Sequence, residues 1–153
     1  GRQGHWPAPA HDVVSAMDFI AREMPGVPTG IVGHSAGGHL GLWAAAHRAD
    51  DIKLFVGLAP ITDLAAMAGS GSVGSWDAQS LLDSGAPPAV DPIDERTLLV
   101  HGEKDEIVPV SHSTRLSTGS RIEVVTGMGH FPMLDPKREH WPLVVAELGK
   151  ALV

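Results

Sequence analysis

Three polar residues of this sequence each follow an apolar run, and together their side chains could carry out acyl transfer. Ser35 lies at the centre of the segment G-H-S-A-G, Asp105 follows residues 97–100, and His130 follows residues 122–126. A serine hydroxyl becomes a useful nucleophile when an imidazole takes its proton and a carboxylate orients that imidazole. The chain order Ser, Asp, His fits a sheet of alternating strands and helices.

The segment around Ser35 predicts a strand, a sharp turn and a helix. Residues 31–32 are β-branched, and residues 39–47 are compatible with a helix. A turn of this kind lifts the hydroxyl away from the surface. We expect a side chain at Gly33 or Gly37 to collide across the turn. The pattern G-x-S-x-G alone is weak, and the alternative is a glycine-rich connection whose serine only caps the helix.

The proposed acid and base also have ordinary alternatives. Asp105 alone could be a turn or helix-cap aspartate, and His130 is one of nine histidines. Asp63 follows another predicted strand and is the second candidate for the acid. Glu103 and Glu106 flank Asp105, but each would approach from a different direction. The catalytic interpretation is favoured because all three residues follow strands in the expected order.

Composition indicates one globular domain over residues 1–153. The chain is 43% hydrophobic with a mean hydropathy of +0.06, which is ordinary for a globular protein. Its net charge is −7 and it has no basic run, so we expect neither nucleic acid nor a membrane as a partner. The absence of cysteine excludes disulfides, zinc–thiolate sites and a cysteine nucleophile. It leaves the compartment open, with the cytoplasm only weakly favoured.

Two further motif types are set aside. Residues 69–74 match G-x-G-x-x-G, but we expect no strand before them and no helix opening directly from them, so nucleotide binding is not expected. The histidines lack metal-ligand spacing, and His34 is expected to lie beside the nucleophile rather than on a metal. The sequence therefore predicts no metal ion and no organic cofactor. The four tryptophans are expected to be packing residues.

Apolar runs alternate with segments of helical spacing along the chain. We predict strands at residues 31–32, 53–59, 97–100 and 122–126, and helices at residues 10–24, 39–47, 76–82, 111–117 and 137–148, with a Gly-, Ser- and Pro-rich excursion over residues 69–92. This alternation predicts an α/β fold with a doubly wound, mostly parallel sheet. Ligands bind outside the carboxyl ends of such strands, where Ser35, Asp105 and His130 are expected.

Three segments carry a family resemblance: GHSAGGHL (33–40), LLVHGEKDEIVPV (98–110) and GMGHFPMLDP (127–136). They resemble the α/β-hydrolase superfamily, especially its esterase and prolyl-oligopeptidase-like members, which also resemble kynurenine formamidases. Residues 4–20 are similar to the helix before the nucleophile strand of that group. The resemblance implies an α/β-hydrolase fold with Ser35 as nucleophile, Asp105 as acid and His130 as base.

The chain departs from that family pattern before residue 30. Further strands and an oxyanion-loop motif are expected there, so we expect this sequence to be the C-terminal part of a larger hydrolase, with a preceding segment or a second chain completing the sheet. Only the backbone N–H of Ala36 is then available to the oxyanion, and losing one such donor typically costs about 100- to 1000-fold in turnover.

The expected function is hydrolysis of a small carboxylic ester. An amide, a formamide or a short peptide remains open because the same three residues serve each of these substrates. The alternative of another class is a non-catalytic module with a truncated hydrolase fold.

Overall fold

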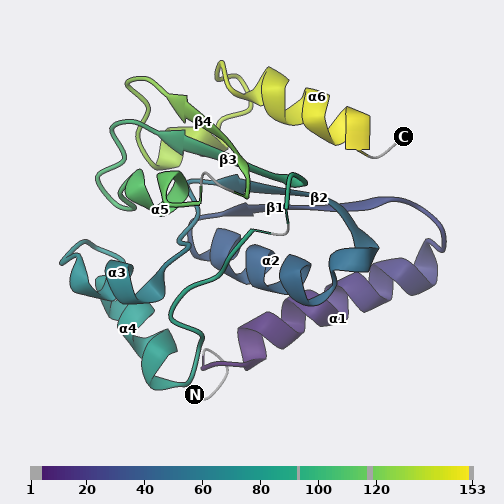
Figure 1. Cartoon of the computed structure of the whole chain (residues 1–153), viewed down its shortest axis with the longest axis horizontal. Helices are drawn as coiled ribbons and strands as arrows, with labels where there is room; N and C mark the ends of the chain where they lie inside the picture. Colours follow the sequence, from purple (N-terminus) through teal and green to yellow (C-terminus); the bar gives the residue numbers. More distant parts are fainter. Residues whose placement is uncertain (1–4, 93, 117–118, 152–153) are drawn as a thin grey trace.

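A sheet of four parallel strands forms the centre of the molecule (Figure 1). The computed structural model describes residues 5–92, 94–116 and 119–151. The strands lie in sequence order across the sheet: β1 (Thr29–His34), β2 (Ile52–Leu58), β3 (Thr97–Gly102) and β4 (Arg121–Val125). The predicted parallel sheet is therefore confirmed, and β1 and β4 are its two edges.

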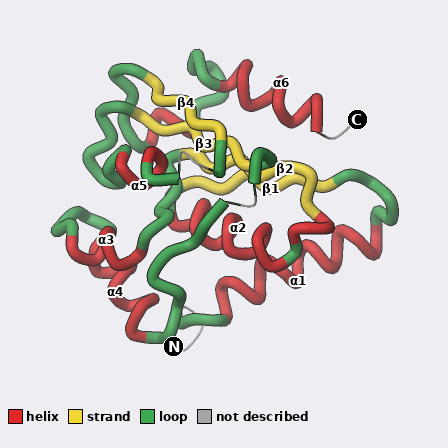
Figure 2. Tube along the Cα trace, in the orientation of Figure 1, coloured by secondary structure: helices red, strands yellow, loops and turns green. Residues whose placement is uncertain are grey.

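Helices cover both faces of the sheet, as the doubly wound prediction requires (Figures 1 and 2). One face carries α1 (Ala8–Glu23) and α2 (Ala36–His47), and the opposite face carries α6 (Trp141–Ala151). Three shorter helices lie in the connections: α3 (Leu64–Gly69), α4 (Ser75–Asp83) and α5 (Ser111–Thr114). In the described part of the chain, no helix has both the length and the apolarity needed for a bilayer crossing.

The core lies in two layers because neighbouring residues of a strand point to opposite faces of the sheet. Phe55 packs with Leu42 of α2 on one face. Val56, the next residue of β2, packs with Val144 of α6 on the other face. Both strand residues are fully buried. The nearly continuous apolar run of β2 follows from this double burial.

Two helices differ from the sequence prediction. Helix α3 was not predicted; its N-terminus is capped by Asp63, whose Oδ1 accepts a hydrogen bond of 2.8 Å from the Ala66 N–H. Helix α6 begins at Trp141 rather than at residue 137, because Asp135 holds the preceding residues in a turn through its contact with the Lys137 N–H at 3.0 Å. Pro142 then occupies the first helical turn, where proline is tolerated.

The other helices agree with the prediction in type but differ in extent. Helix α1 begins two residues earlier than the predicted range of 10–24, and α4 extends slightly beyond 76–82 at both ends. Helix α5 ends at Thr114, and position 117 of the predicted range 111–117 lies outside the described residues.

Candidate active site

Ser35 occupies a strained turn between β1 and α2. Its backbone dihedral angles are φ 55° and ψ −123°, a conformation that costs a non-glycine residue about 1–3 kcal/mol. The turn is held on both sides, because the Ser35 N–H donates to the Leu58 carbonyl at 3.1 Å and the Ile61 N–H donates to the Ser35 carbonyl at 3.1 Å. The end of β2 therefore fixes the backbone of the predicted nucleophile.

Of the two glycines predicted to be required in this turn, the structure confirms one. A Cβ atom at Gly33 would lie 2.5 Å from the Gly37 carbonyl oxygen, so the expected collision exists at Gly33. The expectation for Gly37 was wrong, because a Cβ atom there would meet no atom within 4 Å. Gly38 is the crowded position instead, since its Cβ would lie 2.6 Å from the Pro60 Cβ. The close contact is thus between the first turn of α2 and the segment after β2.

Asp105 and His130 form a buried hydrogen-bonded pair. Asp105 lies in the turn after β3 and His130 follows β4, and the His130 Nδ1–H donates to Asp105 Oδ2 at 2.6 Å. The second carboxylate oxygen, Oδ1, accepts from the backbone N–H groups of Ile107 at 2.9 Å and Val108 at 2.8 Å. The Asp105 side chain is fully buried, and that of His130 is 4% exposed. The carboxylate thus orients the imidazole with its Nε2 left free of this bond.

The surroundings of Asp105 keep it ionised. Burial alone raises the pKa of this carboxyl, but interactions with His101 and His130 and the N–H groups of Val108 and Ile107 together outweigh burial and hold the pKa well below its ordinary value. A charged carboxylate beside His130 stabilises an imidazolium there.

His34 connects the turn of the nucleophile to the loop that carries the base. Its Nε2–H donates to the His130 carbonyl oxygen at 3.2 Å, and the two imidazole rings are 4.4 Å apart between centroids. Burial, followed by the nearby His130, lowers the pKa of His34. Ser35, the next residue, makes no side-chain hydrogen bond with any residue in the described ranges. The structure therefore joins Asp105 to His130 directly and brings their loop against the Ser35 turn through His34.

The alternative acids have other partners. Asp63 caps α3. Glu103 Oε2 accepts a hydrogen bond of 2.9 Å from the Gly127 N–H, so this carboxylate fixes the start of the loop that carries His130. Glu106 is exposed. Ala36 is the first residue of α2, and the first N–H groups of a helix have no partner within it. Its N–H is the predicted oxyanion donor.

Two contributors to the site were missed by the sequence analysis. His101, in β3, is fully buried and lies beside Asp105, and Ser113, in α5, is hydrogen-bonded to His101 at 2.7 Å. His101 stands within the segment LLVHGEKDEIVPV, but its position at the end of a strand gave no sign that its ring turns toward the carboxylate.

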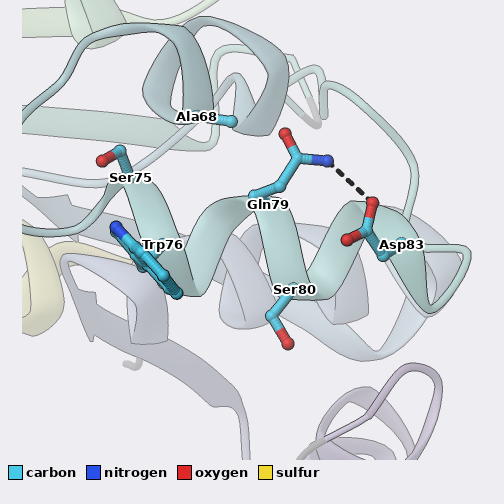
Figure 3. Close-up of a pocket in the computed structure, with 6 residues that line it drawn as sticks. All are labelled: Ala68, Ser75, Trp76, Gln79, Ser80 and Asp83. Carbon is cyan, nitrogen blue, oxygen red and sulfur yellow. Dashed lines mark hydrogen bonds between the residues drawn. The ribbon is translucent and has the colours of Figure 1, made fainter.

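A separate open hollow of about 550 Å³ lies along α4 (Figure 3). Trp76 and Gln79 are among the residues that line it, and Gln79 donates a hydrogen bond of 2.7 Å to Asp83. Trp76 is 87% exposed, so the prediction that all four tryptophans pack was wrong for this one. Trp6, Trp43 and Trp141 do pack against the core.

The motif at residues 69–74 connects α3 to α4. The expectation that no helix opens from it was wrong, because α4 begins directly after Gly74. A helix rather than a strand precedes the motif, so it lacks the context of a dinucleotide site. In residues 5–92, 94–116 and 119–151, no cluster of three or more His, Asp or Glu side chains has the arrangement of a metal site.

Comparison with known proteins gives a family and a fold. The family model described as "Prolyl oligopeptidase family" matches residues 8–144. No curated protein matches the sequence significantly.

Many solved structures are similar to this chain. An α/β hydrolase enzyme from the metagenome of lagoon sediments of Mar Chica, Morocco, is 14% identical with a TM-score of 0.66, over 92% of this chain and 70% of that one. An acetyl ester-xyloside bifunctional hydrolase from Caldicellulosiruptor lactoaceticus is 20% identical with a TM-score of 0.71, over 95% and 66%. Est1E from Butyrivibrio proteoclasticus is 22% identical with a TM-score of 0.67, over 92% and 66%. These likenesses confirm the predicted α/β-hydrolase fold.

Proposed function

Because this chain belongs to the prolyl oligopeptidase family, within the α/β-hydrolase superfamily, we propose that it is a serine hydrolase that cleaves a small carboxylic ester. Ser35 is the nucleophile, His130 the general base and acid, and Asp105 the carboxylate that orients His130. The observation that carries the proposal is the 2.6 Å hydrogen bond from His130 Nδ1 to Asp105 Oδ2, in a loop held against the strained turn of Ser35.

The reaction proceeds in two acyl-transfer steps. His130 Nε2 takes the proton of the Ser35 hydroxyl as the oxygen attacks the ester carbonyl, and Asp105 stabilises the imidazolium that forms. The Ala36 N–H at the start of α2 donates to the developing oxyanion. His130 then returns the proton to the departing alcohol. Water, activated by the same imidazole, hydrolyses the acyl-enzyme and regenerates Ser35.

The test of the nucleophile is pre-steady-state release of p-nitrophenol from a short-chain p-nitrophenyl ester. The wild-type protein is expected to give a burst that is equal in amount to the enzyme, and Ser35→Ala is expected to give none. Equal rates for the two proteins would contradict the assignment of Ser35. If neither protein exceeds the buffer rate, the result favours the non-catalytic module instead.

The role of Asp105 is tested by a matched pair of aspartate variants. Asp105→Asn is expected to lower kcat by about 10⁴-fold, because the neutral amide neither holds the tautomer of His130 nor stabilises its cation. Asp63→Asn is expected to leave kcat unchanged, since asparagine is as good a helix cap as aspartate. Steady-state ester hydrolysis measures both variants. A large loss of kcat in Asp63→Asn with little loss in Asp105→Asn would assign the role of the orienting carboxylate to Asp63 instead of Asp105.

A second candidate substrate is an amide or a short peptide. It is supported by the prolyl oligopeptidase family match and uses the same three residues. Rates with a p-nitrophenyl ester and with the p-nitroanilide of a short peptide distinguish the two. A higher kcat/KM for the anilide, abolished in Ser35→Ala, would replace the ester proposal with the peptidase one.

We further propose that an additional segment or a second chain covers the open side of β1. Val32 in this edge strand is 44% exposed, and Met24 and Val27 before it are 52% and 50% exposed. An edge strand beside exposed apolar side chains readily pairs with another strand. The molecular mass in solution, measured by light scattering, separates a monomer from a pair of chains.

A further inference from the structure

His101 contacts both ends of the turn that carries Asp105. Its Nε2 lies 2.9 Å from the Val108 carbonyl oxygen and 3.5 Å from Asp105 Oδ2. Its Nδ1 lies 2.7 Å from the Ser113 hydroxyl oxygen. His101 and Ser113 are both fully buried, so water does not compete for these bonds.

The partners of Nε2 decide where its proton lies. The Val108 carbonyl and the Asp105 carboxylate are both acceptors only, so an unprotonated Nε2 would place its lone pair against two oxygens. Nε2 therefore carries the proton and donates to Val108. In the neutral imidazole Nδ1 is then an acceptor, and the Ser113 hydroxyl donates to it. Ser113 thereby supports the tautomer that the two acceptors beside Nε2 select.

Val108 connects the turn of residues 105–108 to Asp105 through its N–H and to His101 of β3 through its carbonyl oxygen. The Val108 N–H donates to Asp105 Oδ1 at 2.8 Å, while the Val108 carbonyl accepts from His101. With Oδ1 fixed by the turn, the position of Oδ2 depends on where Val108 is held. We propose that His101 is a positioning residue, which aims Asp105 Oδ2 at His130 Nδ1 by anchoring Val108 to strand β3.

Anchoring outweighs the direct contact between His101 and the carboxylate. At 2.9 Å the bond to Val108 has the length of a normal hydrogen bond, whereas 3.5 Å to Oδ2 is too long for a strong one. Losing the imidazole also leaves the buried Val108 carbonyl without this donor. The carboxylate then shifts, and its bond to His130 lengthens and weakens. Besides Asp105, the ionisable groups that interact with His101 are His34 and His112, and His130 contacts the same carboxylate oxygen as His101.

The inference rests on the proposed function for its kinetic test, in which the full chain carries His101→Met. We expect kcat to fall by about 10- to 100-fold with KM nearly unchanged, because the substrate still binds but the base is misplaced. The acid limb of the kcat/KM profile is expected to move to lower pH by about half a unit, since a more distant carboxylate stabilises the imidazolium less. His101→Gln, which keeps an N–H near the position of Nε2, is expected to restore most of kcat and to return the acid limb close to its wild-type position. A purely structural role would lower the folded fraction without moving the acid limb.

A measurement that needs no substrate keeps the inference separate from the proposed function. The proton on His130 Nδ1 is observed by NMR of protein with ¹⁵N-labelled histidine and assigned with His130→Gln. We expect its resonance to move upfield in His101→Met and to return in His101→Gln. His39→Asn, which removes a buried imidazole bonded to Ile61 rather than to Asp105, is the control that leaves it in place.

These measurements distinguish the positioning role of His101 from the proposed hydrolase function. An unmoved resonance and an unmoved acid limb in a folded His101→Met would overturn the positioning role. A shifted resonance in a protein whose Ser35→Ala variant is as active as wild type would retain the role and reject the hydrolase. If His101→Met does not fold, Ser113→Ala is used. It removes only the hydroxyl that donates to His101 Nδ1, and we expect shifts in the same direction but smaller.

Discussion

At the scale of single residues, the strained backbone of Ser35 is expected to lower the stability of the fold. Its positive φ of 55° is strained for any residue with a Cβ, whereas glycine adopts such angles readily. We expect Ser35→Gly to raise the free energy of unfolding by about 1 kcal/mol relative to Ser35→Ala; both variants lack the proposed nucleophile. Urea denaturation of the two variants measures the difference. Equal midpoints would mean that the turn stores no strain at this residue.

His39 is expected to make the stability of the protein dependent on pH. Burial lowers the pKa of His39 to about 4, whereas the unfolded chain has the ordinary value of about 6.5. Between these values the unfolded state binds more protons, so the contribution of His39 is complete above pH 6.5 and is lost as the pH falls toward 4. The full loss amounts to about 3 kcal/mol.

The test for His39 is urea denaturation at pH 7.5 and pH 5. His39→Asn keeps a donor for the Ile61 carbonyl but cannot titrate, so its stability is expected to fall less between the two pH values. His47→Asn, at an exposed position in the same helix, is expected to keep the wild-type difference. An equal loss in wild type and His39→Asn would assign the acid sensitivity to another group.

At the scale of elements, the packing of α2 against the end of β2 distinguishes two neighbouring glycines. Gly37→Ala is expected to stabilise the protein by up to about 1 kcal/mol, because its Cβ enters open space in a helix. Gly38→Ala is expected to destabilise it by about 1–3 kcal/mol, because its Cβ meets Pro60. Thermal denaturation compares the two. A shared sign would contradict the close approach of α2 to Pro60.

The sequence could predict the elements better than their contacts. The continuous apolar runs of β2 and β3 indicated strands buried on both faces, and the strand ends indicated the edge where Ser35, Asp105 and His130 would lie. Helix α3 could not be predicted because it has only six residues and because an aspartate such as Asp63 is as typical of a turn as of a helix cap. The bonds of His101 could not be predicted because they depend on Val108 and Ser113, which reach it only through the folding of the 105–113 segment.

At the scale of the whole molecule, the proposed association through the open side of β1 is tested by a charge placed on that strand. Val32→Lys is expected to reduce self-association at high concentration, because a charge on an edge strand opposes pairing. Its effect on stability is expected to stay within about 0.5 kcal/mol, as the side chain is already 44% exposed. Light scattering over a concentration series measures the change. Val73→Lys, at an 85% exposed residue between α3 and α4, is the control expected to associate like wild type.

The order of the strands determines which residues of the proposed site stay together when the edge strand β1 detaches. Asp105 follows β3 and His130 follows β4, which are adjacent in the sheet, whereas Ser35 follows the edge strand β1 on the other side of β2. We expect a partial opening that detaches β1 to separate Ser35 from the hydrogen-bonded pair of Asp105 and His130. Because α1 and α2 flank β1 in the chain and pack on the same face of the sheet, both helices would have to return with β1 before the site is rebuilt.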